Sequence, residues 1–347
     1  MEFEMQYEVT IGIPVYKAAD YIQNTMESAL AQTFDNIEYL VLDDCGNDGS
    51  ISVVEKIKSD YPRGKDIRIL YHDRNYGVGV SRNRILKEAR GRYLYFLDSD
   101  DLMEPDTISR MMSVMKQYLA QVVYGSWERV DNVSHTPSEK YIYPFTELLL
   151  PDALAMYAFR NYSSFRISVC NCLMDVDFLR SSRLQFLDTV FWEDLAFTYE
   201  MVTKVSRAVL LPDITYHYLC RPGSLSHYQD REKLEKAEIL KNVSIIDYLK
   251  EKCSDLVEKS YLPYLCYNLE MNGFYIVCHI LKYYQRIVPS FSNREMQSII
   301  RHPLSFSKIL RFRKKLFPNI LLWLLGNGPT LLLLPTIKVI ARLKKVI

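Results

Sequence analysis

Hydrophobic and polar positions alternate with two distinct periods at the start of the chain. Apolar residues occupy every second position from Val9 to Val15, and Pro14 is placed to end this run, which predicts a strand. Asp20 then precedes an apolar face that repeats at helical spacing up to about Gln32, which predicts a helix capped by that aspartate. The chain therefore begins with a strand followed by a helix.

The same succession continues as far as residue 97. Strands are predicted for "IEYLVL", "IRILYH" and residues 93–97, and helices for residues 51–59 and 81–90. Strands that alternate with helices are typical of a doubly wound α/β sheet, in which ligands bind at the carboxyl ends of the strands. We therefore expect an α/β fold with its binding site at that edge of the sheet.

The pattern is less regular further along the chain. It predicts a helix over 106–119, a strand at "AQVVYGSW", a helix at "WEDLAFTYEMV" and a pair of strands at "AVLLPDITYHYL". The segment after Arg231 is mainly helical. We therefore expect one domain over residues 1–230 and a helical extension over residues 231–347.

Charge and cysteine content narrow the class of protein. The 347 residues include 43 Lys and Arg and 42 Asp and Glu, a net charge of +1 that does not favour nucleic acid as a partner. Seven cysteines without zinc-binding spacing indicate thiols in a reducing cytosol. The amino terminus lacks the features of a signal peptide, so we expect a cytoplasmic protein.

An acidic cluster follows the apolar run that ends at Leu97. Asp98 and Asp100 are two residues apart, so in an extended chain they share a face, while Asp101 points elsewhere or starts a turn. Two such carboxylates suit a divalent cation that keeps open positions for phosphate oxygens. An acidic turn that caps the helix beginning near Pro105 is the alternative.

A second acidic cluster follows "IEYLVL". A carboxylate of Asp43-Asp44 at a strand end is suited to accept a hydrogen bond from uracil or from a ribose hydroxyl. The alternative is that Asp43 or Asp48 caps the next helix. "GVGVSR" at residues 77–82 matches only half of a dinucleotide-binding fingerprint, because the third glycine is missing, so NAD is not expected.

Two longer stretches resemble a known family. "VTIGIPVYKAADYIQNTMESALAQTFDNIEYLVLDDCGNDGS" and "NYGVGVSRNRILKEARGRYLYFLDSDD" are similar to family 2 glycosyltransferases with the GT-A nucleotide-sugar-binding fold, of the bacterial surface-polysaccharide type, and the likeness runs from about Val9 to His227. The resemblance implies an inverting, metal-dependent transfer from a nucleotide-sugar, a UDP-sugar, to a glycan or lipid-linked acceptor.

The resemblance also implies roles for residues that bind the donor. Pro14 and Tyr16 would meet the uracil, Asp44 would hydrogen-bond the base, and Arg82 would support the acidic cluster or the diphosphate. Ser81 stands where the family has alanine. Residues 45–47, Cys-Gly-Asn, stand where Gly-Ser-Thr is usual, which leaves the donor preference open.

The chemistry is carried by the acidic residues that match the family's motifs. Asp98 and Asp100 match the DxD motif, with Asp100 as the direct ligand of Mg²⁺ or Mn²⁺. Glu193-Asp194 matches the family's Glu-Asp pair, so Asp194 would be the catalytic base. A plain negative charge at the start of a helix is the alternative for Asp194.

The segment "YHYLCRPGSLSH" resembles the part of the family that closes near the diphosphate. Arg221 and Ser224 are the candidates for phosphate contact, since a fork of donors suits phosphate oxygens. His227 would complete the metal shell, or it is an ordinary surface or packed histidine.

The carboxyl-terminal part has the composition of a membrane-surface segment. "RFRKK" at residues 311–315 precedes an uncharged stretch, Leu316–Ile337, that prolines, glycines and asparagines interrupt. We expect residues 311–347 to contact the inner face of the cytoplasmic membrane as an interfacial or re-entrant anchor. A helical hairpin packed on the catalytic domain, or a dimer contact, is the alternative.

Two other functions compete with glycosyl transfer. A Mg²⁺-dependent phosphohydrolase with the DxD aspartate as nucleophile leaves Asp44 and Asp194 without a role. A glycosyltransferase-like subunit that binds nucleotide or a partner without turnover is disfavoured by the presence of Asp44, Asp98, Asp100 and Asp194.

Overall fold

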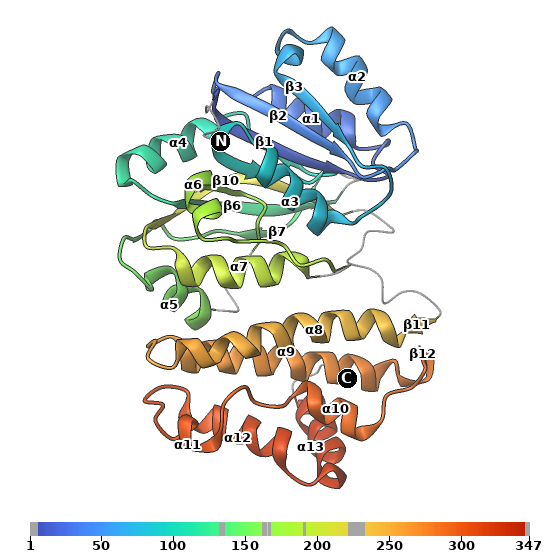
Figure 1. Cartoon of the computed structure of the whole chain (residues 1–347), viewed down its shortest axis with the longest axis vertical. Coiled ribbons are helices and arrows are strands. Elements are labelled where there is room, and N and C mark those ends of the chain that lie inside the picture. The colour runs from blue at the N-terminus through green and yellow to red at the C-terminus, as the bar shows by residue number, and fades with distance from the viewer. Residues whose placement is uncertain are drawn as a thin grey trace. The chain divides into compact units, whose positions relative to one another are not determined.

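The computed structural model describes residues 6–131, 136–161, 165, 168–189, 192–220 and 233–343. The chain divides into two compact units. Unit 1 consists of Met1–Leu154, Ser164–Asp188 and Glu193–Ser224, and unit 2 of Ala155–Ser163, Thr189–Trp192 and Leu225–Ile347. Unit 1 is built on a β-sheet, whereas unit 2 is mainly helical (Figure 1).

A mixed ten-stranded sheet forms the centre of unit 1. Its order is β3-β2-β1-β4-β9-β6-β10-β5, with β7 on β6 and β8 on β10. The first four strands are parallel, and β9 runs antiparallel to both β4 and β6. The strands are β1 (Tyr7–Val15), β2 (Ile37–Asp43), β3 (Ile67–Tyr71), β4 (Gly91–Phe96), β5 (Leu102–Met103), β6 (Val122–Asp131), β7 (Pro137–Tyr141), β8 (Thr146–Leu148), β9 (Cys172–Asp175) and β10 (Ala208–Cys220).

Helices pack on both faces of this sheet. Alternate residues of the strands, such as Val9, Ile11 and Ile13, form one core with α1, α2 and α4. The opposite face meets α3, where Gly12 leaves room for Ile85, because a Cβ on Gly12 would lie 2.4 Å from Ile85 Cγ2. The helices are α1 (Ile22–Leu30), α2 (Ser50–Asp60), η1 (Pro62–Asp66), α3 (Val78–Glu88), α4 (Thr107–Tyr118), α5 (Ala153–Arg160, mostly in unit 2), α6 (Val176–Ser181) and α7 (Glu193–Lys204).

The predicted α/β fold is confirmed, with two local corrections. Asp20 does not cap α1, which begins after Tyr21 without a side-chain cap. The predicted strand pair at 208–219 is the single strand β10, and its register with β6 shifts between Leu210 and Ile214. Pro212 lies at that irregularity, where its missing N–H interrupts the pairing without ending the strand.

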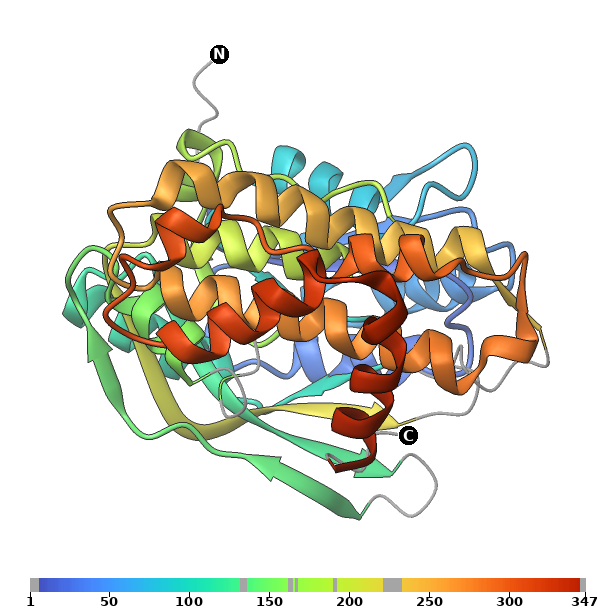
Figure 2. The same cartoon turned by 90° about the horizontal axis from the view of Figure 1, so that it is seen from below.

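Unit 2 is a group of helices with one short pair of parallel strands. Figure 2 shows the long helices α8 and α9 beside each other. Its elements are β11 (Leu234–Glu235), α8 (Lys236–Lys252), η3 (Cys253–Leu256), α9 (Leu262–Lys282), η4 (Tyr284–Arg286), β12 (Ile287–Val288), α10 (Asn293–Ile299), α11 (Phe306–Ile309), α12 (Leu316–Asn327) and α13 (Thr330–Leu343).

The apolar segment near the carboxyl terminus forms α12 and α13. Asn319, Leu322 and Gly326 of α12 are buried in unit 2. Phe317 and Leu324 on the same helix are 76% and 52% exposed. Of the helices that the structure describes, none has the length and apolar content to cross a bilayer. One side of α12 is therefore packed and another presents apolar side chains to the outside.

Candidate active site

The carboxyl ends of three neighbouring strands meet at one edge of the sheet in unit 1. Val15 of β1 is in register with Asp43 of β2, and the N–H of Asp44 donates to the carbonyl of Val15 at 2.9 Å. Beyond β4, the N–H of Leu97 donates to the carbonyl of Gly12 at 3.0 Å. Both acidic clusters therefore follow strands that end at the same edge.

The acidic loop after β4 separates its three carboxylates. The N–H of Asp101 donates to the carbonyl of Asp98 at 3.1 Å and closes a turn. Asp101 is buried, and it accepts hydrogen bonds from Tyr216 Oη at 2.5 Å and from the N–H of Leu219 at 2.8 Å. Asp98 and Asp100 are only partly buried. Asp101 thus attaches the loop to β10, and the other two carboxylates remain accessible.

Arg82 of α3 connects this loop to α7. Its side chain is 5% exposed, its Nη2 donates to Asp98 Oδ1 at 2.7 Å, and its Nη1 donates to Glu193 Oε1 at 2.5 Å. Burial lowers the pKa of the Arg82 guanidinium, but the surrounding negative groups, Asp98 first, outweigh it and raise the pKa above the ordinary value of arginine. The guanidinium is therefore a permanent cation that joins the loop after β4 to the first turn of α7.

The segment before α7 is fixed against α3 by a reciprocal pair of hydrogen bonds. Asn83 Nδ2 donates to the carbonyl of Phe186, and the N–H of Phe186 donates to Asn83 Oδ1, each at 2.8 Å. The Phe186 ring stacks on Phe197 of α7, with 4.0 Å between ring centroids. Gly79 permits the approach, because a Cβ there would lie 2.6 Å from the Leu187 carbonyl oxygen. The second glycine of "GVGVSR", Gly79, therefore has a packing role.

Asp194 lies in the first turn of α7, next to Glu193. Burial, followed by the negative charge of Glu193, raises the pKa of the Asp194 carboxyl to about 7, although Arg82 acts in the opposite direction. A carboxyl with this pKa exchanges its proton near neutral pH.

Cys170 is a member of the site that the sequence did not reveal. Its Sγ donates to Asp98 Oδ2 at 3.3 Å. Burial and the charge of Asp98 raise the pKa of the Cys170 thiol well above its usual range, so the thiol stays protonated and can donate. None of the sequence motifs that indicate the site includes Cys170. The pairing of β4 with β9, which continues as a bridge between Phe96 and Cys170, brings this residue beside Asp98.

Asp44 is 2% exposed and holds the turn that precedes α3. Its Oδ1 pairs with His72 Nδ1 at 2.7 Å and accepts from the N–H of Tyr76 at 2.9 Å. Its Oδ2 accepts from the N–H of Gly77 at 2.8 Å. Asp48 has other partners. It accepts hydrogen bonds from the N–H of Ser50, the first residue of α2, and from the N–H of Ala19.

The first strand ends in an exposed aromatic ring. Pro14 is buried within β1, whereas the Tyr16 side chain just beyond it is 44% exposed, with Lys17 Nζ 5.3 Å from its ring centroid. Arg221, Ser224 and His227, the candidates for phosphate and metal contact, lie outside the described residues. In the part of the chain that is described, no group of three or more His, Cys, Asp and Glu side chains is placed to hold a metal ion.

Comparisons with known proteins find a family model and named relatives that this chain resembles. Residues 10–181 match the family model described as glycosyl transferase family 2. A Bacillus subtilis (strain 168) protein named for teichuronic acid biosynthesis is 32% identical over 42% of this chain and 56% of its own length. An Escherichia coli protein named UDP-Glc:alpha-D-GlcNAc-diphosphoundecaprenol beta-1,3-glucosyltransferase is 29% identical over 68% of this chain and 87% of its own.

The fold also matches a solved structure. Residues 1–349 of S. aureus TarS, crystallised with UDP-GlcNAc, superpose with a TM-score of 0.60 over 92% of this chain and 90% of that one, at 19% identity. This likeness confirms the predicted GT-A fold. The chain spans little more than half of the Bacillus subtilis relative's length.

Proposed function

Because the chain belongs to glycosyl transferase family 2, we propose that it transfers a sugar from a nucleotide-sugar, a UDP-sugar, to a glycan or lipid-linked acceptor in polysaccharide biosynthesis. The Escherichia coli relative is named for a UDP-sugar donor and a diphosphoundecaprenol-linked acceptor, and TarS was crystallised with UDP-GlcNAc. The observation that carries the proposal is the Arg82 bridge, because it joins the acidic loop after β4 to the carboxyl pair of α7.

We propose that the uracil and ribose bind where β1 and β2 end. The exposed Tyr16 ring beyond Pro14 offers a flat apolar face for the base. Asp44 Oδ1 takes part in two hydrogen bonds and Oδ2 in one, so Oδ2 keeps one acceptor position for the N3–H of uracil. Arg221 and Ser224 remain the proposed contacts of the diphosphate.

The charges of the site fit a divalent cation. Glu193 and Asp98 act on Asp194, and Asp100 and Asp98 act on Asp101. Burial first, and then the negative charge of these neighbours, raises the pKa of both carboxyls, although the guanidinium of Arg82 opposes the shift at Asp194. Carboxylate oxygens are the ligands that Mg²⁺ and Mn²⁺ prefer. Asp100 and Asp98 would hold the ion, with His227 as a further ligand. When bound, the ion would neutralise charge on the departing diphosphate.

Asp194 is the proposed catalytic base of an inverting transfer. Its carboxylate takes the proton of the acceptor hydroxyl while that oxygen forms a bond to C1 of the donor sugar. The bond from C1 to the diphosphate oxygen breaks, and its electron pair leaves with the nucleoside diphosphate. Attack on the face opposite the leaving group inverts the configuration at C1. A pKa of about 7 suits a base that works near neutral pH.

Product analysis tests this mechanism. The purified protein is incubated with UDP-sugars, a saccharide acceptor and Mn²⁺, and the anomeric configuration of the product is read by NMR. We expect inversion, and a loss of about a hundredfold or more in kcat for Asp194→Asn. Asp188→Asn, an exposed aspartate near the same helix, is the control and should keep full activity. Retention of configuration, or unchanged turnover by Asp194→Asn, contradicts the assignment.

We also propose that residues 311–347 contact the inner face of the cytoplasmic membrane. The basic residues 311–315 directly precede α12, on which Phe317, Leu321 and Leu324 are exposed at helical spacing. A basic segment beside an apolar helix face suits an anionic membrane surface. Flotation with anionic vesicles tests this, and Phe317→Ser/Leu321→Ser should reduce it. Leu119→Ser, which changes a leucine 74% exposed in unit 1, is the control. Equal flotation of all variants refutes the contact.

A further inference from the structure

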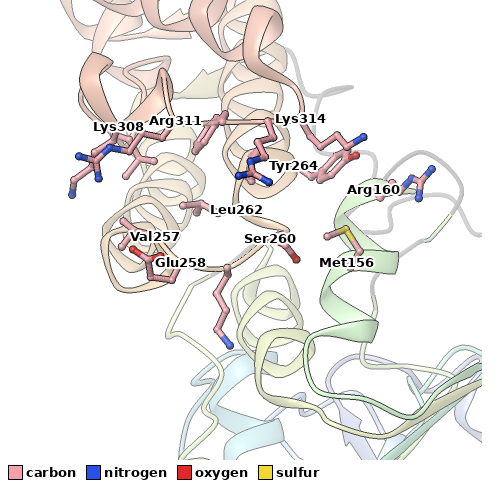
Figure 3. Close-up of a pocket in the computed structure, with 15 residues that line it drawn as sticks. Met156, Arg160, Val257, Glu258, Ser260, Leu262, Tyr264, Lys308, Arg311 and Lys314 are labelled. Carbon is pink, nitrogen blue, oxygen red and sulfur yellow. The ribbon is translucent and has the colours of Figure 1, made fainter.

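Unit 2 contains a cavity of about 800 Å³ that the proposed catalytic chemistry does not use. Three segments that lie far apart in the sequence line it: the end of α5, the residues from 257 to the start of α9, and the loop around α11. Figure 3 shows Arg160 on one side of the cavity and Lys308 with Arg311 on the other. Its volume is in the range of ordinary ligand pockets.

The lining of this cavity is strongly cationic. Among the residues that the structure describes, six basic side chains line the cavity against one carboxylate, that of Glu258. In the described part of the chain, no ion pair joins a carboxylate to five of them, Arg160, Lys308, Arg311, Arg313 and Lys314. The cavity also lies at the amino-terminal end of α9, where the helix dipole is positive. Such a concentration of positive charge favours a multiply charged anion.

The same cavity has an apolar wall. Leu262 and Leu304 are almost fully buried in it, and Met156, Tyr264 and Phe312 are half-buried around it. A site for a free inorganic anion has no need of such a surface. The combination of cationic and apolar walls suits a ligand with a charged head and an apolar chain.

Buried polar contacts anchor the segments that carry the basic residues. Asn319 is fully buried, and its Nδ2 donates to the carbonyl of Pro263 at the start of α9 at 3.1 Å, while its Oδ1 lies 3.0 Å from His302 Nε2. Lys250 Nζ donates to the carbonyls of Ile299 and Arg301 at 2.9 and 2.8 Å. The loop that carries Lys308, Arg311, Arg313 and Lys314 is thus anchored on both sides, by the contacts of Lys250 with Arg301 and by those of Asn319. These contacts hold the wall of the cavity in place.

We infer that this cavity binds the diphosphate group of a polyprenyl-linked acceptor, with the basic side chains on the phosphates and the first part of the prenyl chain on the apolar wall. The inference rests on the proposed function, because it names the class of acceptor for that transfer. The basic segment is followed directly by α12, whose exposed apolar side chains suit a membrane surface. Contact of α12 with the membrane would allow the remainder of the prenyl chain to stay in the bilayer.

Binding of farnesyl diphosphate to the full-length protein tests the inference, with farnesol and inorganic pyrophosphate as separated halves of the ligand. Wild type should bind farnesyl diphosphate about tenfold more tightly than either half. Lys308→Gln/Arg311→Gln should weaken this binding by about tenfold or more. Glu258→Gln should tighten it, because the one opposing charge is removed. Lys241→Gln/Arg294→Gln removes two exposed cations of unit 2 outside the cavity and should have no effect.

Three results would overturn the inference. The first is equal binding of farnesyl diphosphate by both double variants, and the second is binding of pyrophosphate as tight as that of farnesyl diphosphate. The third is a Lys308→Gln/Arg311→Gln variant that binds anionic vesicles more weakly but binds farnesyl diphosphate as the wild type does. UDP-induced stabilisation is measured in the same proteins and should be identical in all of them. A wild type that binds farnesyl diphosphate at this cavity without responding to UDP would support the site and contradict the proposed function.

Discussion

Arg82 of α3 and Glu193 of α7 form an ion pair, 2.5 Å between Nη1 and Oε1, although 111 residues separate them in the sequence. The other arm of the same guanidinium donates to Asp98 at 2.7 Å. One buried cation therefore fixes the position of the α7 first turn, and with it Asp194, relative to the acidic loop after β4. The geometry of the proposed active site therefore depends on that side chain.

Replacing Arg82 by Gln should both destabilise the protein and abolish transfer. The variant leaves the Glu193 and Asp98 carboxylates without their counter-charge, and breaking a buried pair in this way costs about 3 kcal/mol or more. Arg82→Lys should rescue only partly, because a single ammonium cannot reproduce the two-armed contact. Urea denaturation and a transfer assay measure the two effects.

The control for Arg82 is another arginine of unit 1. Arg110 pairs with Asp106 and Asp213, but its side chain is 47% exposed. Arg110→Gln should therefore lower the free energy of unfolding by less than about 1 kcal/mol. Equal losses of stability in the two arginine variants would show that the buried Arg82 bridge contributes no more than an exposed ion pair.

Asp194→Asn should lose activity and yet gain stability at alkaline pH. In the folded protein the pKa of Asp194 is about 7, above its ordinary value of 3.8. The folded state therefore binds the proton more tightly than the unfolded chain. This contribution to stability is complete below about pH 4 and is lost as the pH rises through 7.

Unfolding of wild type and Asp194→Asn is compared at pH 5 and pH 8, in EDTA so that no divalent ion alters the titration. The difference between them should favour the variant more at pH 8 than at pH 5. A difference that is independent of pH would show that Asp194 does not titrate in this range.

Gly79→Ala should impair the site although alanine is the better helix former. The substitution gains about 1 kcal/mol of helix propensity. Its Cβ, however, would lie 2.6 Å from the Leu187 carbonyl oxygen and 3.3 Å from Glu193 Cβ, and the carbonyl belongs to backbone that must shift. We expect lower thermal stability and a lower kcat. A stabilised and fully active variant would refute the close contact of α3 with this segment.

Unit 2 offers an independent test at a buried ion pair. Lys250 Nζ lies 2.7 Å from Glu270 Oε1, with side chains 8% and 0% exposed, and burial raises the pKa of Glu270 to about 7. Lys250→Met should cost about 3–5 kcal/mol, because the carboxyl loses its partner. Lys250→Met/Glu270→Leu should recover most of this loss. If chemical denaturation gives the double variant the same low stability, the carbonyls that Lys250 also binds dominate its role.

The sequence predicted the elements whose signals are local. Apolar runs and the acidic residues that follow them placed β1, β2 and β4 and both acidic clusters, because parallel strands end at a common edge. The pattern predicts two strands where the structure has the single strand β10. Pro212 signals a break, and the pairing with β6 continues past it by a shift in register.

Contacts between distant segments were beyond the sequence. Cys170 reaches Asp98 only through the pairing of β9 with β4, and no periodicity marks a thiol as a donor to a carboxylate. Asp101 follows Asp98 by three residues in the same acidic cluster. Only the fold shows that the Asp101 carboxylate is bound by Tyr216. The linear sequence also gave no sign that Arg311, Arg313 and Lys314 of the basic segment 311–315 line a cavity together with Arg160.

Thermal unfolding in the presence of nucleotides shows whether this site binds a nucleotide-sugar through a cation held by Asp100 and Asp98. UDP at 100 times its dissociation constant should stabilise the protein by about 2.7 kcal/mol. We predict this stabilisation with Mn²⁺, its loss in EDTA, and its loss in Asp100→Ala. No stabilisation by UDP, GDP, ADP or dTDP with Mn²⁺ would show that the site binds none of these nucleotides. A response to UDP that persists unchanged in EDTA would show that no cation takes part in the binding.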